Sequence, residues 1–508
     1  MSDVIDRDAA VRALIEAGKP ALVWRRQIAD TETPVSAALK LIEPDRGDFL
    51  LESVEGGETR GRHSLIGLAP DLMFRANGQS AEINPHWLTN RDAFAPAGAP
   101  TLSALRTLVA ACRADVPAEL PGALACLVGY FGYETIGLVE KLPRPAENPL
   151  DLPDMLFVRP TVILVFDRLA DELFLVSPVW PDAPGSPVQR IALAHERIDA
   201  AAARLAQPIP AASAATIPSA MTADIALDPV LPPGRYGEMV TRAKDYIGAG
   251  DIFQVVLAQR FTTPFPLPPF DLYRSLRRIN PSPFLYFLDM PGFALIGSSP
   301  EILVRARDGE VTIRPIAGTR PRGKTAAEDA ENRASLLADP KERAEHLMLL
   351  DLGRNDVGRV ATAGSVTVTD SYTVEFYSHV MHIVSNVVGR LDPAKDALDA
   401  LFAGFPAGTV SGAPKVRACE IIAELECETR GAYAGGVGYF SPDGSMDSCI
   451  VLRTAVVKDG VMHVQAGAGI VADSDPAYEQ RECEAKAGAL IAAAREAVTR
   501  ANGAGFGQ

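Results

Sequence analysis

A glutamate lies on the small-residue face of a predicted C-terminal helix. The helix is predicted over 476–500, with Asp475 as its N-cap and Pro476 as its first residue. Residues at helical spacing form a stripe of Tyr478, Glu482, Ala485, Ala489 and Ala492. A carboxylate among small apolar residues is costly unless a positive charge compensates it. Glu482 therefore either pairs with Lys486, one turn along the helix, or holds a metal ion.

A second helix, predicted over 341–352, presents another glutamate on an apolar face. Glu345 shares this face with Leu349 and Leu352, and the helix is predicted to end in a polar cluster at 351–356. No cluster of histidines or cysteines accompanies the two glutamates, which favours a hard cation. Mg²⁺ uses few protein carboxylates and completes its shell with water and substrate oxygens. Mg²⁺ is therefore the expected cofactor if the two helices meet, which their spacing in the sequence does not show.

Three segments rich in small residues are predicted to be site loops, at 315–322, 405–415 and 465–469. Backbone N–H groups of such loops can approach an anionic ligand closely. The second segment is predicted to open a helix at 413–426, whose N-terminus would also favour an anion. Ordinary turns explain each segment taken alone. The G-x-G at 467–469 is no dinucleotide fingerprint, because no G-x-x-G continuation follows it.

The cysteines give no sign of a metal site or of a nucleophile. They are Cys112, Cys126, Cys419, Cys427, Cys449 and Cys483. None forms a C-x-x-C pair, and none is flanked by the glycines of a nucleophile turn. We expect free, partly buried thiols and no cysteine able to hydrolyse glutamine.

Composition and charge limit the class of protein. The chain has 508 residues, is 47% hydrophobic and carries a formal net charge of −15. This composition is typical of a globular protein and excludes disorder of the whole chain. An acidic chain repels phosphate backbones, so we expect no nucleic-acid partner. The N-terminus lacks a signal-peptide apolar region and no segment reaches the length of a membrane span, so we expect a cytoplasmic enzyme without a membrane partner.

The elements that position these residues alternate irregularly between strands and helices, which predicts an α/β fold of the α+β type. An Ala/Pro/Ser/Thr-rich segment at 207–232 is predicted to link residues 1–206 to residues 233–503. Strands are predicted at 48–53, 64–67, 161–166, 172–176, 253–259, 284–288, 294–298, 303–306, 311–315, 435–440, 449–457 and 461–466. Helices are predicted at 188–205, 235–249, 326–337, 341–352, 413–426 and 476–500.

Six motifs, in order and spacing, make the chain similar to the chorismate-binding enzymes. They are Gly250–Val256, Ser298–Glu301, Pro315–Gly323, Glu345–Asp356, Phe405–Lys415 and Gln465–Val471. Within the family the chain most resembles the aminating component of the anthranilate synthases. The resemblance implies a fold of layered, mainly antiparallel sheets flanked by helices, in which the two sequence regions can pack as one unit.

Two positions separate the reactions within the family. Isochorismate-forming members carry a lysine, which activates water, where this chain has Gln254. A glutamine cannot act as a general base, and ammonia needs no activation. Aminodeoxychorismate synthases carry a nucleophilic lysine where this chain has Ala317. Both positions favour direct amination of chorismate at C2, followed by loss of pyruvate. The alternatives are those two synthases and an inactive tryptophan-binding protein, against which the intact glutamates argue.

The resemblance implies roles for the remaining site residues. Glu345 and Glu482 would hold Mg²⁺ against the ring carboxylate, and Glu301 would protonate the departing C4 hydroxyl. Thr409 would line the site, and His382 would serve the elimination of pyruvate. The substrate contacts would be Gly318 and Thr319 at the ring, with Tyr433, Arg453, Gly467, Ala468 and Gly469 at the enolpyruvyl group. Each of three residues also has an ordinary structural explanation. Glu301 could lie at the surface, Arg453 could form a plain salt bridge, and His382 could make a hydrogen bond in the core.

The resemblance also implies a regulator and a partner. The segment 50–53, with Leu50 and Ser53, and the segment 280–285, with Pro283, Phe284 and Leu285, resemble a feedback site for tryptophan. The family often has tyrosine-methionine where this chain has Phe284 and Leu285. Because the chain has no cysteine suited to glutamine hydrolysis, we expect a separate glutamine amidotransferase subunit and a hetero-oligomer.

Overall fold

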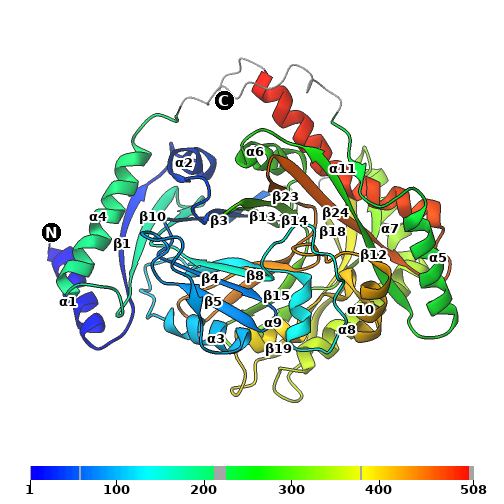
Figure 1. The fold of residues 1–508 in the computed structure, drawn as a ribbon, viewed down its shortest axis with the longest axis horizontal. Coiled ribbons are helices and arrows are strands. Elements are labelled where there is room, and N and C mark those ends of the chain that lie inside the picture. Colours follow the sequence, from blue (N-terminus) through cyan, green and yellow to red (C-terminus); the bar gives the residue numbers. More distant parts are fainter. Residues whose placement is uncertain (1, 56–58, 211–224, 378–379, 503–508) are drawn as a thin grey trace.

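Two large antiparallel sheets form the body of the protein in the computed structural model. The structure describes residues 2–55, 59–210, 225–377 and 380–502. Among these residues, each sheet has twelve strands. The sheets lie one above the other, as Figure 1 shows. The prediction of layered, mainly antiparallel sheets flanked by helices is confirmed.

The first sheet joins strands from both halves of the chain. Its order is β1 (Ala21–Ile28), β10 (Glu172–Val179), β9 (Val162–Asp167), β3 (Thr59–Leu68), β2 (Asp48–Glu55), β13 (Phe284–Met290), β14 (Phe293–Ser299), β23 (Thr454–Lys458), β24 (Val461–Ile470), β12 (Gln254–Pro264) and β11 (Asp228–Pro229), and β20 (Gly412–Ala413) pairs with β12. The junction is the β2–β13 pair, in which Ser53 is the partner of Phe284.

The second sheet carries most of the remaining site segments. Its order is β17 (Ile316–Pro321), β19 (Val380–Arg390), β16 (Glu310–Ile313), β15 (Ile302–Arg307), β22 (Met446–Ile450), β21 (Gly436–Phe440), β7 (Leu127–Phe131), β8 (Met155–Arg159), β4 (Leu72–Asn77), β5 (Ser80–Asn84) and β6 (Ala95–Pro96), and β18 (Thr367–Phe376) pairs with β19. Each sheet thus contains strands from 1–206 and from 233–503. The division at 207–232 stays a prediction, and residues 211–224 lie outside the described residues.

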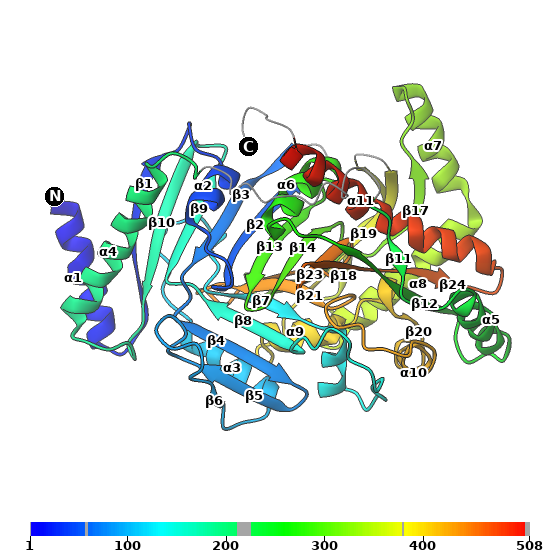
Figure 2. The same ribbon diagram turned by 45° about the horizontal axis from the view of Figure 1, so that its top comes forward.

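Helices cover the outer faces and the ends of the sheets. They are α1 (Ser2–Glu16), α2 (Pro34–Leu41), α3 (Thr101–Ala111), α4 (Pro187–Leu205), α5 (Arg235–Gly248), α6 (Pro269–Ile279), α7 (Ala326–Ala338), α8 (Pro340–Gly358), α9 (Ala397–Gly404), α10 (Lys415–Leu425) and α11 (Pro476–Asn502), with short 3₁₀ turns at Tyr133–Leu138 and Gly408–Val410. Figure 2 shows α1 and α4 beside β1 and β10, with α7 at the opposite end of the molecule. Helix α11 packs on α6 and on β24.

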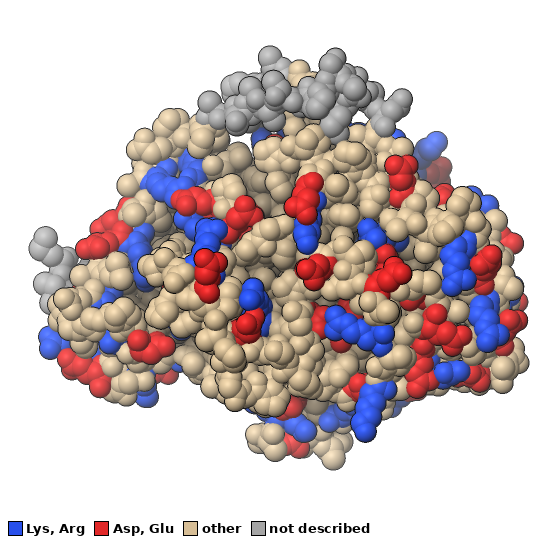
Figure 3. Space-filling view, viewed as in Figure 1, with Lys and Arg blue, Asp and Glu red and all other residues tan. Residues whose placement is uncertain are grey.

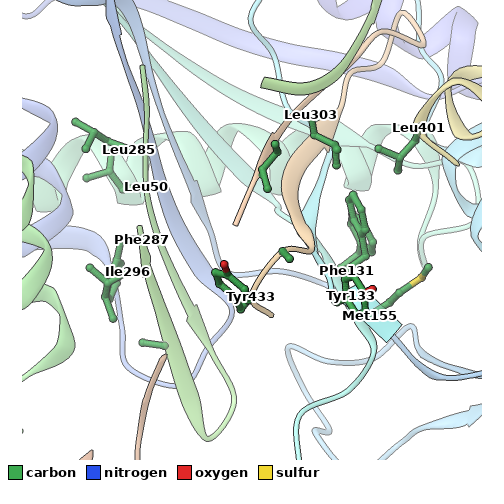
Figure 4. Close-up of a cluster of buried hydrophobic side chains, with 14 of the residues drawn as sticks. Leu50, Phe131, Tyr133, Met155, Leu285, Phe287, Ile296, Leu303, Leu401 and Tyr433 are labelled. Atoms are coloured by element: carbon green, nitrogen blue, oxygen red, sulfur yellow. The ribbon is translucent and has the colours of Figure 1, made fainter. Parts of the chain in front are cut away.

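Apolar side chains of both sheets pack between the layers. One cluster combines Phe49 and Leu288 of the first sheet with Val128 and Val158 of the second, all fully buried. On the opposite face of the first sheet, Leu50 and its cross-strand partner Phe287 belong to another cluster, in which the ring of Phe287 packs against Phe270 of α6; Figure 4 shows Phe287 near Ile296. These side chains anchor β13 and β14, and β14 leads directly into the segment that carries Glu301.

The surface charges are mixed in sign. On the face in Figure 3, lysines and arginines of the described residues are interspersed with aspartates and glutamates. Some of them form ion pairs between elements distant in sequence, such as Arg106 with Asp396 at 2.6 Å. Exposed pairs of this kind contribute little stability. No helix among the described residues has the length and apolar character needed to span a bilayer.

Three predicted elements differ from the structure. Residues 449–457 were predicted as one strand, but they form the end of β22 and most of β23, which belong to different sheets. Arg453 lies at the break with a φ of 48°, a left-handed conformation that ends an extended run. Residues 315–322 were predicted as a loop, yet β17 occupies most of them. Helix α8 continues to Gly358, so the polar cluster at 351–356 lies within the helix.

Candidate functional site

Glu301 is a buried carboxyl group between two strands. It lies between the last residue of β14, Ser299, and the first residue of β15, Ile302, and its exposed fraction is 7%. The hydroxyl of Thr409 donates to its two carboxylate oxygens, at 3.1 Å each. Burial raises the pKa of Glu301 to about 8, although the Thr409 hydrogen bond opposes this rise. Glu301 is therefore protonated at neutral pH and can donate a proton.

The turn that carries Thr409 is pressed against α8. A Cβ atom on Gly408 would lie 2.3 Å from Leu352 Cδ2 and 3.2 Å from Leu349 Cδ2, so the backbone of the turn packs closely against these two side chains. Residues 405–415 thus form the predicted loop, with a 3₁₀ turn at Gly408–Val410. The packing places Thr409 and Glu301 beside the helix that carries Glu345.

Glu345 on α8 and Glu482 on α11 are close enough to affect each other. Burial raises the pKa of Glu345, and the negative charges of Glu342 and Glu482 raise it further. The side chain of Gln254 donates a hydrogen bond to Glu345, which lowers the pKa. The two glutamates predicted from separate helices are therefore brought together. Each of them is half-buried.

The predicted stripe on α11 is wrong, because the buried face is displaced by about one residue. Tyr478 and Ala485 are exposed. The buried residues are Glu479, Cys483, Ala487, Leu490, Ile491, Ala493, Ala494, Ala497 and Val498. Glu482 lies at the edge of this face, and its Oε1 is 2.8 Å from Lys486 Nζ. The ordinary alternative for Glu482, a pair with Lys486, is thus present beside the Glu345 carboxylate.

The pair of glutamates fits a metal ion that needs few protein ligands. Among the described residues, no group of three or more His, Cys, Asp or Glu side chains could hold a metal ion. The negative charge of Glu482 contributes to the raised pKa of Glu345, so a cation placed between the two carboxylates would be favourable. This donor set suits Mg²⁺, which takes one or two carboxylates and retains water or substrate oxygens.

Gln254 contributes a buried amide next to Glu345. Its exposed fraction is 5%, and its Oε1 has no hydrogen-bond partner within the described part of the chain. Gly469 makes room for this side chain, since a Cβ atom there would lie 2.5 Å from Gln254 Nε2. A buried acceptor without a partner is costly, so it is a position where a ligand can donate.

The strand β24 lines the site through its glycines. A Cβ atom on Gly467 would lie 2.8 Å from the Tyr433 hydroxyl oxygen, and Lys486 Nζ donates to the Gly467 carbonyl at 2.8 Å. Residues 465–469 were predicted to be a site loop, but they form part of β24, which continues to Ile470. Successive residues of a strand face opposite sides of the sheet. The fully buried side chain of Ala468 therefore lies on the side of β24 away from the site, which Ala468 can reach only through its backbone.

His382 on β19 is held against β17. Its Nδ1 lies 3.0 Å from the Gly318 carbonyl oxygen and 3.1 Å from Thr319 Oγ1. Gly318 has a φ of 74° where the register between the two strands shifts. Burial lowers the pKa of His382 to about 4, so the imidazole is neutral at neutral pH. The structure therefore joins His382 to Gly318 and Thr319, as the predicted site requires.

Arg453 brings an unpaired cation to the site. Within the described residues its guanidinium has no hydrogen-bond or ion-pair partner, and burial lowers its pKa. The charge of Arg453 also lowers the pKa of His382, which indicates that the two side chains are near each other. A plain salt bridge is thus not its role here, and a carboxylate ligand would satisfy it in a bidentate geometry.

An arginine that the sequence interpretation missed supports Tyr433. Arg430 is 2% exposed and pairs with Glu426 at 2.6 Å. It also donates to the carbonyls of Val410 and Val256, at 2.7 and 2.8 Å, and lies 5.5 Å from the Tyr433 ring centre. Arg430 thus ties the Thr409 turn to β12 and to Tyr433. The only signal in the sequence is a charged pair four residues apart, which is common on helix surfaces.

The segments predicted to bind tryptophan line one cavity of about 730 Å³. Ser53, Pro283, Phe284 and Leu285 all contribute to its wall. Leu50 does not, contrary to prediction. It is fully buried in the core, while Leu51 lines the cavity from the same face of β2 as Ser53. The neighbouring Glu52 is buried and accepts hydrogen bonds from Tyr273, Arg168 and Arg277.

Comparison with known proteins shows the family of the chain. The model of the chorismate binding enzyme family matches residues 48–492. The chain belongs to this family. Anthranilate synthase component 1 of Cereibacter sphaeroides is 52% identical over 499 residues, which cover 97% of this chain and 98% of that protein.

Solved structures of the chorismate-binding family share the fold. The crystal structure of anthranilate synthase component I from Streptococcus pneumoniae aligns with a TM-score of 0.74 at 35% identity, covering 92% of this chain and 99% of that chain. The menaquinone-specific isochorismate synthase of Escherichia coli aligns with a TM-score of 0.70 at 18% identity, covering 97% and 99%. The second likeness supports the fold alone.

Proposed function

We propose that this protein is the aminating and lyase component of an anthranilate synthase, which converts chorismate and ammonia to anthranilate and pyruvate. The observation that carries the proposal is the buried acid Glu301, in a chain that has a glutamine and not a lysine at position 254, beside Glu345. An acid is needed to expel a hydroxyl group, and a glutamine suits a nucleophile that needs no base. The identity to anthranilate synthase components supports the same reaction.

In the first step, ammonia adds to C2 of chorismate and the C4 hydroxyl leaves as water. The protonated Glu301 donates the proton to this hydroxyl, and the Thr409 hydroxyl orients the carboxyl group. The unpartnered Oε1 of Gln254 accepts an N–H of the incoming ammonia. The ring double bonds shift, and the product is an aminated cyclohexadiene that retains its enolpyruvyl group.

Glu345 and Glu482 would hold Mg²⁺ against the ring carboxylate of the substrate. The ion supplies positive charge that binds this carboxylate and offsets the two glutamates. Lys486 neutralises Glu482 in the free protein. Its second contact, to the Gly467 carbonyl, would hold the ammonium group at the site with Mg²⁺ bound.

In the second step, the ring loses the C2 proton and the C3–O bond breaks, which releases pyruvate and leaves the aromatic anthranilate. The neutral His382 donates from Nδ1 to the Gly318 carbonyl, which leaves Nε2 free to accept the C2 proton. Arg453 would hold the enolpyruvyl carboxylate, and Tyr433 would lie against the same group beside Gly467.

Ammonia would come from a glutamine amidotransferase subunit. The curated relatives are named component 1, a name that supports a second component. Of the six cysteines, five are buried and only Cys427 is exposed. None is flanked by the glycines of a nucleophile turn, which supports a separate subunit for the hydrolysis of glutamine. Tryptophan would occupy the cavity that β2 and β13 line together with strands of the second sheet, and would inhibit the enzyme.

The proposal is tested with the purified chain, chorismate, Mg²⁺ and ammonium chloride. Anthranilate is detected by its fluorescence, and pyruvate is measured in parallel by a coupled assay. We expect both products in equal amounts, no activity with glutamine alone, and no activity with Glu301→Gln. Isochorismate or aminodeoxychorismate as the end product would assign one of the rival reactions. No turnover of chorismate, together with tryptophan binding, would make the chain a regulatory protein.

A further inference from the structure

Tyr377 lies directly beside His382. It follows β18, and its backbone is fixed by two hydrogen bonds, from its N–H to the Val380 carbonyl at 2.8 Å and from Arg322 Nη1 to its own carbonyl at 2.7 Å. Its ring meets the imidazole edge-on, with the ring centres 5.3 Å apart and the planes at 69°. Tyr377 is 6% exposed, so the ring has little freedom to move.

The ring completes the support of the imidazole. The Gly318 carbonyl can only accept, so Nδ1 of His382 carries the proton and is held by β17. That hydrogen bond fixes the position of Nδ1, but the imidazole ring can still rotate about the hydrogen bond. The edge-on contact with Tyr377 sets the plane of the ring, and with it the direction of Nε2. A small rotation of a catalytic base away from its proton is costly for the rate.

The same tyrosine forms part of the wall of the 730 Å³ cavity. Its hydroxyl donates to Glu375 Oε2 at 3.1 Å, and Glu375 pairs with Arg314. All three residues line the cavity that contains Ser53 and Phe284. Tyr377 therefore has neighbours in the catalytic site, of which His382 is in ring contact, and neighbours in the cavity wall.

We propose that Tyr377 is a positioning residue for His382, and that a ligand in the cavity inhibits the enzyme by displacing the Tyr377 ring. The inference rests on the proposed function and adds the residue through which its regulation acts. An aromatic amino acid that fills the cavity would contact its wall, of which Tyr377 is a part. Packed interiors respond to such contact by discrete shifts of side chains, and a shift here turns the imidazole.

The test compares three variants in the ammonium-dependent assay, with tryptophan as the probe ligand. Tyr377→Leu should lower kcat by about 10- to 100-fold while KM for chorismate changes less than about threefold. Its tryptophan Kd, measured by calorimetry, should stay within about threefold, but saturating tryptophan should no longer lower its activity. Tyr377→Phe keeps the ring and should restore most of the lost kcat. Tyr439→Leu also changes the cavity wall without touching His382, and should weaken tryptophan binding and inhibition in parallel.

A second measurement covers the case in which Tyr377→Leu does not fold, as judged by its thermal melt. In the wild-type protein with ¹⁵N-labelled histidines, the His382 ring signals, assigned with His382→Asn, should move when tryptophan is added. Full inhibition of a folded Tyr377→Leu variant, or His382 signals that tryptophan leaves unchanged, would overturn the inference. Failure of the proposed function is separate, because the wild-type protein would then form no anthranilate.

Discussion

The hydroxyl of Thr409 donates to both carboxylate oxygens of Glu301, at 3.1 Å each. The two residues are 108 positions apart in the sequence. Among the described residues, the Thr409 hydroxyl is the one hydrogen-bond donor that affects the pKa of this carboxyl group. Burial raises the pKa to about 8 and Thr409 opposes the rise. Thr409 therefore both orients the acid and sets the pH at which it remains protonated.

Replacement of Thr409 by valine should move the pH profile of the reaction. Without the hydroxyl, the pKa of Glu301 rises further, so the alkaline limb of kcat/KM shifts to higher pH. The profile is measured at a constant concentration of unprotonated ammonia. Ser411→Ala is the matched control, because Ser411 belongs to the same turn and its hydroxyl donates to Ala407. A profile of Thr409→Val that overlays the wild type would contradict this assignment.

The burial of Glu301 should also appear in protein stability. Its pKa is raised from 4.5 to about 8 in the folded protein, so the folded state binds the proton more tightly than the unfolded state. Between these values, rising pH destabilises the wild type by up to about 1.4 kcal/mol per unit through this group. Glu301→Gln should therefore gain stability relative to the wild type as the pH increases from 5 to 8. Urea unfolding measures this gain, and Glu310→Gln, whose side chain is exposed at the start of β16, should show none.

The Mg²⁺ assignment predicts equal roles for two residues on different helices. Glu345→Gln and Glu482→Gln should each lower activity by at least about 100-fold at any Mg²⁺ concentration, while the thermal melt stays near the wild type. Calorimetry should show weaker Mg²⁺ binding. Glu484→Gln, an exposed neighbour on α11, is the control and should behave as the wild type. Near-normal Mg²⁺-dependent activity of Glu482→Gln would remove it from the metal site.

Gln254 allows a test of the nucleophile. Gln254→Leu removes the acceptor for ammonia and also the hydrogen bond to Glu345. We expect KM for ammonium to rise by about 3- to 10-fold, in line with the loss of one hydrogen bond. KM for chorismate should change less. A larger effect on chorismate than on ammonium would assign Gln254 to binding of the ring.

Residue types and spacing predicted the two glutamates, whereas the other site residues were implied by the resemblance to the chorismate-binding enzymes, and neither route predicted the contacts. The two glutamates stood out as carboxylates on apolar helices, although the stripe on α11 was misplaced by about one residue. A long, Ala-rich helix has small residues on several faces, so periodicity alone does not define the buried one. The pairing of Glu301 with Thr409 depends on strand β15 and a turn more than 100 residues away, which local pattern cannot reveal.

Elements whose ends depend on distant contacts were also the ones predicted wrongly. The strand at 449–457 reads as one apolar run, yet it is divided between two sheets at Arg453. The segment 315–322 looks like a loop because of its glycine and prolines, but pairing with β19 makes it a strand. Tyr377 and Arg430 carry no motif of their own, and only the fold shows what they touch. Tertiary packing overrides local preference at such positions.

The last prediction concerns the cavity lined by the paired strands β2 and β13. Ser53→Phe should fill the part of the cavity where the partner strand carries Phe284, so tryptophan should bind at least about 10-fold more weakly. The ratio of activities with and without tryptophan should then approach one. If tryptophan and chorismate favour different conformations, each should weaken the binding of the other by the same factor, typically about 5- to 150-fold.

Calorimetric titration with tryptophan, with and without saturating chorismate, measures this factor. Ammonia is left out so that no turnover occurs. Ser103→Phe, on the exposed face of α3, is the control for adding a bulky ring and should leave both quantities as in the wild type. A tryptophan affinity that neither chorismate nor Ser53→Phe changes would place the inhibitor site elsewhere on the molecule.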